Sequence, residues 1–369
     1  MSPRKRAVAA PPSPPRLDLS GSGLRRARAL PAAAGGVPSP HPLHAGASMN
    51  LGLLGPWIEL LASLGLDPHA LWPAVVALDF LGDQWTPFAP RHDELRALYG
   101  IDVQPLTVWR PLAEHAIEQL SAGHALSIDV DAFWLPDAAS HRQEHSKTTI
   151  VLTEVDLAAC RITYVHGTGW FQAHGDDATQ LLGLDGGTSE LEAIADWRGA
   201  RVAEVGAAAV ALAEGQLAPH AQIIRVDRRL ARSTEELQML ALHHLGCHLA
   251  FRPSTNPVRR FAARLADDLP LLREYGTGYA EQWISCTVRR LAAASGFAAR
   301  GLAWQEASAN SPLHAAAPAF ERIARDATTL DGKLARAVAS TKAIGAATLL
   351  EGIAAAWDEG MAALEAAGR

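Results

Sequence analysis

Histidines and aspartates gather around one predicted β-hairpin in the middle of the chain. An imidazole exchanges a proton near neutral pH and can act as an acid or a base, and mixtures of imidazole and carboxylate also suit divalent metals. None of these residues has a diagnostic metal-binding spacing such as HExxH, so the spacing by itself predicts no metal site. The alternative is an ordinary polar strand face that hydrogen-bonds the following loop. The residues are Asp129, Asp131, Asp137, His141, His145 and His166.

A predicted strand presents the first two aspartates. Residues Ala125–Phe133 alternate between apolar and polar side chains, which places Leu126, Ile128 and Val130 on one face. Asp129 and Asp131 then share the opposite face. A further strand is expected at Ile223–Val226.

Two more predicted strands position the histidines. Thr148–Val155 and Arg161–Val165 are rich in β-branched residues and are separated by a turn, which predicts a hairpin. His145 lies just before the first of these strands, and His166 follows the second.

Helical patterns flank the strands on both sides. Apolar residues recur at helical spacing from Trp57 to Leu64, and Asp67-Pro68 predicts the start of a second helix that continues to Leu78. Short helices are expected at Asp93–Tyr99 and Pro111–Leu120, and another in the alanine-rich segment Val205–Leu217. From Ser233 onward every segment is helical in pattern. The pattern breaks at Arg252–Pro257, Gly276–Gly278, Ser295–Gly301, Asn310–Pro318 and Asp331-Gly332, which predicts about five helices, as in a helical bundle. The sequence therefore predicts an α+β fold with an all-helical C-terminal half.

Three regions follow from these patterns. Residues 1–48 are rich in proline, alanine and arginine and contain few large apolar side chains, so we expect a disordered leader. Residues 49–230 are expected to form the α+β domain, and residues 231–369 the helical domain.

The charge distribution and the cysteines exclude several classes of protein. The leader before Met49 carries a net charge of about +6, so the rest carries about −12 of the total of −6. A body this acidic does not favour nucleic-acid binding. The chain has three cysteines without paired spacing, lacks a long apolar segment and shows no cofactor motif. We expect a cytoplasmic protein that binds neither nucleic acid nor membrane and needs no cofactor.

Two polar groups in the helical half have alternative interpretations. In ALHHLGCHLAF, the pairs His243/Cys247 and His244/His248 could each hold one side of a metal, but a packed polar helix seam is the simpler interpretation. Cys247 and Cys286 are expected to be buried small apolar residues. The arginine-rich segment Arg252–Arg260 could bind a phosphate or carboxylate, or could cap the next helix.

Several strings in the sequence resemble a bacterial domain-of-unknown-function family. They include WIELLASLGLDP (Trp57–Pro68), DFLGDQW (Asp79–Trp85), VDAFWLPD (Val130–Asp137) and HSKTTI (His145–Ile150), and NPVRRFAARLADDLP (Asn256–Pro270) continues the likeness. The resemblance extends over nearly everything after Trp57.

A more distant similarity is to the papain-like acyltransferase of butirosin biosynthesis and to bacteriocin-processing cysteine peptidases. These proteins share a cysteine at the start of a helix, a strand that ends near Leu-Pro, and a histidine that opens a hairpin strand. The resemblance implies a papain-like N-terminal half and a carrier protein as partner. It also implies catalytic roles for His145 as base and His166 as the residue that orients it. Asp131, on the polar strand face, is the third expected catalytic residue.

One element of this pattern is missing. The nucleophilic cysteine is expected just before the Trp57 helix, but the sequence there is Asn50-Leu51-Gly52-Leu53, and the first cysteine in the chain is Cys160. Ser48 is the nearest hydroxyl.

Three functions are therefore open. The first is a papain-like acyltransferase or hydrolase acting on an aminoacyl or peptide group bound to a carrier protein, impaired by the missing cysteine. The second is a non-catalytic protein that binds the carrier protein or acts as a scaffold. The third is a metal-dependent hydrolase built on the aspartates and histidines.

Overall fold

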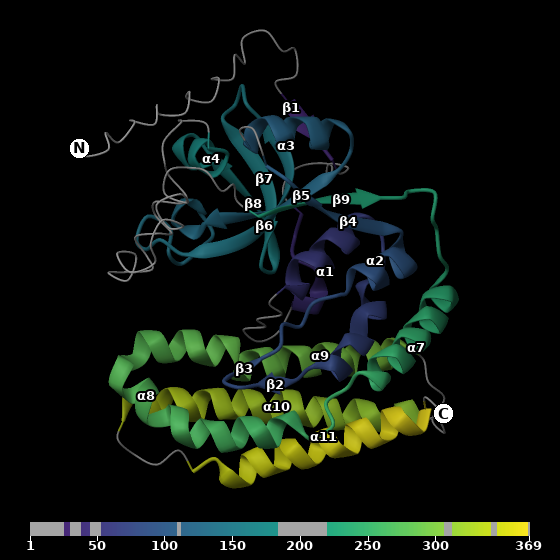
Figure 1. The fold of residues 1–369 in the computed structure, drawn as a ribbon, viewed down its shortest axis with the longest axis vertical. Coiled ribbons are helices and arrows are strands. Elements are labelled where there is room, and N and C mark those ends of the chain that lie inside the picture. Colours follow the sequence, from purple (N-terminus) through teal and green to yellow (C-terminus); the bar gives the residue numbers. More distant parts are fainter. Residues whose placement is uncertain are drawn as a thin grey trace, which may run out of the picture. The chain divides into compact units, whose positions relative to one another are not determined.

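The computed structural model describes residues 26–29, 38–44, 53–108, 112–183, 220–305, 312–340 and 345–367. Its contacts divide the chain into two compact units. Unit 1 comprises Met1–Ala29, Pro105–Thr163 and Gln172–Ile223, and unit 2 comprises Leu30–Gln104, Tyr164–Phe171 and Ile224–Arg369. The fold is α+β, with a sheet and helices in the N-terminal half and helices alone after β9 (Figure 1).

The sheet of the described residues has seven strands. Their order is β4-β9-β5-β6-β7-β8, and β1 also pairs with β6. The strands are β1 (Arg26–Arg28), β4 (Ile101–Leu106), β5 (Ala125–Asp131), β6 (Lys147–Asp156), β7 (Arg161–His166), β8 (Gly169–His174) and β9 (Ala221–Val226).

The strands that present the candidate residues form as predicted. β5 pairs antiparallel with β6, in a register that runs from Leu126 opposite Leu152 to Asp131 opposite Lys147. Leu126, Ile128 and Val130 are buried, which confirms the predicted apolar face. Helix α3 (Leu112–Ser121) packs against β5 and β6 in the same unit.

Besides β1, two strands of this sheet were not predicted. β4 contains Pro105, which cannot donate a hydrogen bond within a sheet and so conceals the strand pattern. β8 begins at Gly169 and does not alternate in burial, so its sequence carries little strand signal.

Part of the leader differs from the expected disorder. Arg26–Arg28 form β1, and Ala27 and Ala29 are each only 4% exposed. The composition of the leader did not predict this strand, because pairing with β6 and ion pairs stabilise it rather than large apolar side chains.

The predicted helices before the sheet are present in unit 2, with one change of type. α1 (Leu54–Ser63) is followed by η2 (Pro68–Ala77), then by the short hairpin of β2 (Phe80–Leu81) and β3 (Gln84–Trp85), and by α2 (His92–Tyr99). η2 is a 3₁₀-helix rather than an α-helix. Pro73 within it lacks the N–H that an α-helix would use. Asp67 caps η2 by accepting from the His69 backbone N–H at 3.0 Å.

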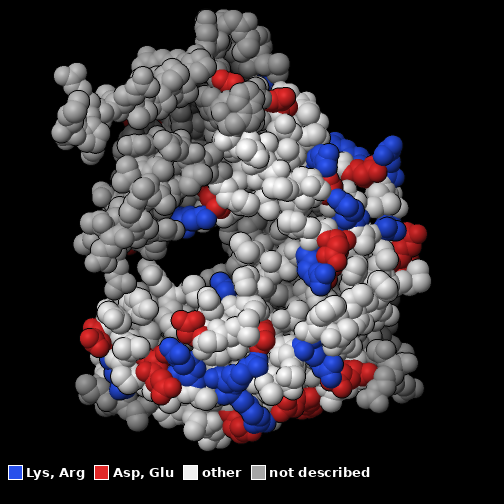
Figure 2. Space-filling model, in the orientation of Figure 1, with Lys and Arg blue, Asp and Glu red and all other residues white. Residues whose placement is uncertain are grey.

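Five helices form the described C-terminal region. They are α7 (Thr234–Ala250), α8 (Pro257–Cys286), α9 (Val288–Trp304), α10 (Pro312–Ala339) and α11 (Ala347–Ala367). α8–α11 lie side by side in Figure 1, and basic and acidic side chains are interspersed over the face of this bundle in Figure 2. None of the described helices is long and apolar enough to cross a bilayer.

The predicted breaks between these helices are only partly correct. Gly276 has a φ of 86° and kinks α8, as its Gly-Thr-Gly sequence predicted. The breaks expected at Ser295–Gly301 and Asp331-Gly332 are wrong, because these residues lie inside α9 and α10. A glycine inside a helix can serve close packing instead of ending it. The predicted helix at Val205–Leu217 lies outside the described residues.

The units combine segments from both predicted domains. Residues 30–104, which include α1, η2 and α2, group with the C-terminal helices, and η2 packs against α7 and α9. The domain boundary at 230 therefore stays a prediction.

Gly301 provides a test of this packing. A Cβ atom at Gly301 would lie 2.1 Å from the Cβ of the buried Trp72, whereas one at Gly296 in the same helix would meet only the Cβ of Ala324, at 3.7 Å. We expect Gly301→Ala to lower the free energy of unfolding by about 1–3 kcal/mol through overpacking. Gly296→Ala should be neutral or stabilising by up to about 1 kcal/mol, because alanine favours a helix. Urea unfolding of the two variants checks this. Equal stabilities would contradict the contact between η2 and α9.

Partly buried histidines in unit 2 make stability depend on pH. Burial lowers the pKa of His244 below its usual 6.5, and the nearby positive charges of His243 and His248 add to this effect, although Glu94 opposes it. Burial also lowers the pKa of His41. The unfolded chain therefore binds more protons than the folded chain just below pH 6.5, so stability is complete above that pH and falls as the solution is acidified.

We expect the melting temperature to decrease between pH 7 and pH 5, and to decrease less steeply in His244→Gln. Thermal melts of the two proteins at both pH values provide the measurement. His174→Gln, at an exposed position in unit 1, is the control. If the melting temperature of His244→Gln decreases with pH as steeply as that of the wild type, the pH dependence comes from other groups.

Candidate functional site

The structure brings two of the predicted catalytic residues together. His145 Nδ1 lies 2.6 Å from Asp131 Oδ2. The Asp131 side chain is completely buried, whereas 39% of the His145 side chain is exposed. The pair thus joins a carboxylate inside unit 1 to an imidazole at its surface.

Local backbone geometry fixes the carboxylate. Asp131 is the last residue of β5 and caps the 3₁₀-turn η3 (Ala132–Trp134), accepting from the Phe133 N–H at 3.0 Å. The same oxygen accepts from the Ser146 N–H at 3.2 Å. The Ala132 N–H in turn donates to the Ser146 carbonyl at 2.7 Å. The end of β5 and the residues before β6 are therefore tied together at the residue that holds His145.

The imidazole is held in one orientation. Its ring stacks on Phe133, with 4.3 Å between the ring centroids and an interplanar angle of 19°. A carboxylate only accepts hydrogen bonds, so the shared proton lies on Nδ1 and Nε2 carries the free lone pair. This is the geometry that general-base catalysis by an oriented imidazole requires.

The neighbouring Asp129 has different partners. It accepts from the Thr149 hydroxyl at 2.6 Å and pairs with Lys147 Nζ, also at 2.6 Å. These contacts join β5 to β6 and leave Lys147 paired with an acid.

A second ionic cluster holds the loop between η3 and β6. His141 Nε2 lies 3.0 Å from Asp177, on helix α4 (Asp176–Leu181), and Arg142 pairs with the same carboxylate at 2.6 Å. Arg142 has a φ of 57°, unusual for a residue with a side chain, and its guanidinium lies 4.3 Å from the Trp134 ring centroid. The sequence offered no signal for Asp177 or for the stacking of Phe133, because both depend on contacts across the loop.

The third predicted catalytic residue, His166, lies in unit 2, at the end of β7. The turn that follows it meets the start of the Trp57 helix: a Cβ on Gly55 would lie 2.3 Å from the Gly167 carbonyl oxygen. This turn and α1 are therefore in direct contact. The role of His166 beside His145 stays a prediction. Ser48 and Asn50 lie outside the described residues.

The cysteines are far in sequence from the expected nucleophile position. Cys160 lies in the turn between β6 and β7, and Cys247 and Cys286 lie in α7 and α8. All three are exposed free thiols, so the prediction that Cys247 and Cys286 are buried is wrong.

The polar groups of the helical half have structural partners. His248 Nε2 contacts Glu94 of α2, and both side chains are about 5% exposed or less. Asn256 caps α8 by accepting from the Val258 N–H at 2.9 Å. Arg259 pairs with Glu351 at 2.7 Å. Among the described residues, no group of three histidines, cysteines or acids could hold a metal.

Asp131 provides a stability test of the site. In Asp131→Ala the part-buried N–H groups of Phe133 and Ser146 lose their acceptor, and each unsatisfied group costs up to about 1–3 kcal/mol. Asp131→Asn keeps the accepting oxygen, so we expect a much smaller loss. Chemical unfolding of both variants provides the measurement. Equal destabilisation would show that the two N–H groups do not depend on Asp131.

Comparison with known families agrees with the resemblance seen in the sequence. Residues 43–197 match the DUF1839 N-terminal domain, and residues 234–366 match the DUF1839 C-terminal domain. No curated protein matches the chain. The matched segments contain the His145–Asp131 pair and nearly all of the helical region. The chain belongs to the DUF1839 family.

Proposed function

We propose that the His145–Asp131 pair is the general base of an acyltransferase or hydrolase that acts on an aminoacyl or peptide thioester of a carrier protein. The observation that carries the proposal is the 2.6 Å contact between a buried carboxylate and a solvent-accessible imidazole. The order of the elements supports it further, since β5 ends shortly before Leu135-Pro136 and His145 precedes the hairpin strand β6, as the resemblance to papain-like enzymes implies. The thioester and the carrier protein come from the similarity to the butirosin acyltransferase.

The proposed chemistry needs no cysteine of the enzyme. His145 Nε2 takes a proton from the acceptor, which is water, an alcohol or an amine, as the acceptor attacks the thioester carbonyl carbon. The resulting imidazolium is stabilised by Asp131. Collapse of the tetrahedral intermediate breaks the carbon–sulfur bond, and the departing thiolate receives the proton from Nε2. The acyl group moves to the acceptor, and the imidazole returns to its neutral state.

The Asp131→Asn variant tests the catalytic role of Asp131 separately from its role in stability. The asparagine amide would donate to Nδ1 and thereby force the proton onto Nε2, the nitrogen that must accept it. We expect the rate of thioester cleavage to fall by about 10³–10⁴-fold, the size of effect seen when the acid of such a pair becomes an amide. His145→Gln should reduce the rate as strongly.

The assay follows aminoacyl N-acetylcysteamine thioesters and aminoacylated carrier protein by mass spectrometry, with and without added amine. His174→Gln, an exposed histidine at the end of β8, is the matched control and should keep the wild-type rate. A wild-type rate in Asp131→Asn and His145→Gln would exclude the dyad as the catalytic base.

A non-catalytic function is the second candidate, because the chain has no cysteine before Cys160. In that case the protein binds the carrier protein as a partner or scaffold without turning over its acyl group. Calorimetry should then show binding that Asp131→Asn does not change, and the thioester should survive prolonged incubation. Failure to bind any carrier protein would exclude this function.

A further inference from the structure

β1 pairs with the part of β6 that does not pair with β5. β5 pairs with residues 147–152 of β6, and β1 continues along the strand with Arg28 opposite Glu154, Ala27 opposite Val155 and Arg26 opposite Asp156. The Ala29 N–H also donates to the Thr153 carbonyl at 3.0 Å. Without β1, the backbone of Thr153–Asp156 would present an open edge for strand addition.

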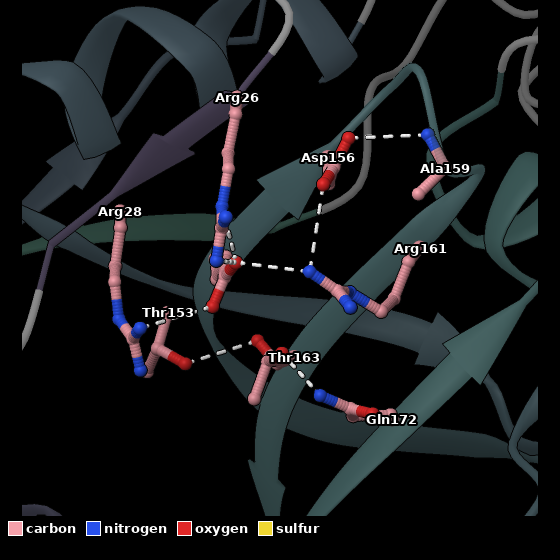
Figure 3. A network of polar contacts seen from close by, with 9 residues as sticks. Arg26, Arg28, Thr153, Asp156, Ala159, Arg161, Thr163 and Gln172 are labelled. Carbon is pink, nitrogen blue, oxygen red and sulfur yellow. Dashed lines mark hydrogen bonds and ion pairs between the residues drawn. The ribbon is translucent and has the colours of Figure 1, made fainter. Parts of the chain in front are cut away.

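The side chains of β6 favour a basic strand at this edge. Glu154 has a side chain only 5% exposed, so its charge needs compensation. Arg26 meets one of its oxygens at 2.7 Å, and Arg28 approaches the other at 3.5 Å. Arg161 also pairs with this carboxylate, and Figure 3 shows the three arginines side by side at this edge.

The sheet alone does not neutralise these acids. Arg161 lies 3.3 Å from Glu154 and 3.4 Å from Asp156, so two carboxylates share one guanidinium from β7. The two arginines of β1 supply the missing positive charge. An extended segment without basic residues would leave Glu154 short of a partner.

The other face of β1 requires small residues. Ala27 and Ala29 are each 4% exposed, Val155 is fully buried, and α3 packs against both β1 and β6. Larger side chains at these two positions would therefore collide with a closed surface. The edge thus selects an arginine–small–arginine–small pattern in an extended backbone.

We propose that the Thr153–Asp156 edge of β6 is a binding site for an extended Arg-small-Arg-small peptide segment, occupied here by the chain's own Arg26–Ala29. The site lies within the family's N-terminal domain, whereas the segment that fills it lies before the matched residues. The mode is strand addition, in which backbone hydrogen bonds give affinity and alternate side chains give selectivity. Because the segment is tethered to the chain, it competes with any free peptide of the same pattern.

The test uses the full chain and a fluorescent peptide of residues 22–32. Arg26→Glu/Arg28→Glu should repel Glu154 and release the tethered strand, and Arg4→Glu/Arg6→Glu is a control with the same change of charge elsewhere in the leader. Fluorescence anisotropy should give a dissociation constant at least about tenfold lower for the first variant than for the wild type or the control. A peptide carrying Leu at positions 27 and 29 should bind at least about tenfold more weakly than the native peptide.

Hydrogen exchange provides the second readout. Amides of Thr153–Asp156 should exchange faster in Arg26→Glu/Arg28→Glu, and saturating peptide should slow them again. Unchanged exchange in this variant, or equal binding of the native and Leu-substituted peptides, would overturn the proposal. Sedimentation of the wild type tests the source of the strand. If the wild type is a dimer and the amides of Thr153–Asp156 lose their protection when it dissociates, the strand comes from a second copy. That result would overturn the assignment to the chain's own residues.

Discussion

A carboxylate removed from water must find hydrogen-bond donors or a positive charge, and this constraint organises both units. Four such groups, Glu59, Glu94, Asp131 and Glu154, are at most 4% exposed. Glu59 of α1 accepts from the His41 N–H at 2.8 Å and pairs with His44 at 3.0 Å. Glu94 holds His248 of α7. Glu154 holds the arginines of β1. Each of these four acids thus holds a residue outside its own helix or strand.

Asp131 differs from the other three in what it holds. His44 and His248 are buried nearly as deeply as their acids, so those pairs are suited to a structural role. His145 keeps a substantial exposed surface while its orientation is set by Asp131 on one side and Phe133 on its face. An oriented, accessible imidazole can meet a substrate, whereas an enclosed one cannot. This difference in exposure singles out the pair as the candidate site.

Local patterns in the sequence were sufficient to predict the elements that carry this site. The alternation of β5 and the β-branched residues of β6 and β7 predicted the strands, and the position of Asp131 and His145 at adjacent strand ends allowed them to meet. Contacts across loops were not predictable, because Phe133, Arg142 and Asp177 become neighbours only through the path of the loop. The helix ends predicted at glycines were wrong for a related reason. Gly301 and Gly332 look like helix ends, but Gly301 is needed for the close approach of Trp72, a tertiary contact that leaves no local signature.

In unit 1, β1 is attached to β6 partly by ion pairs with exposed arginines, whereas Asp131 is held mainly by backbone hydrogen bonds. The two sites should therefore respond differently to ionic strength. Arg26 is more than half exposed, and at 0.15 M salt exposed charges are screened over about 8 Å. The attachment of β1 should therefore loosen as salt concentration rises. The Asp131 side chain has no contact with solvent and takes two of its three donors from the backbone. Salt thus acts on the leader strand while leaving the geometry around His145 intact.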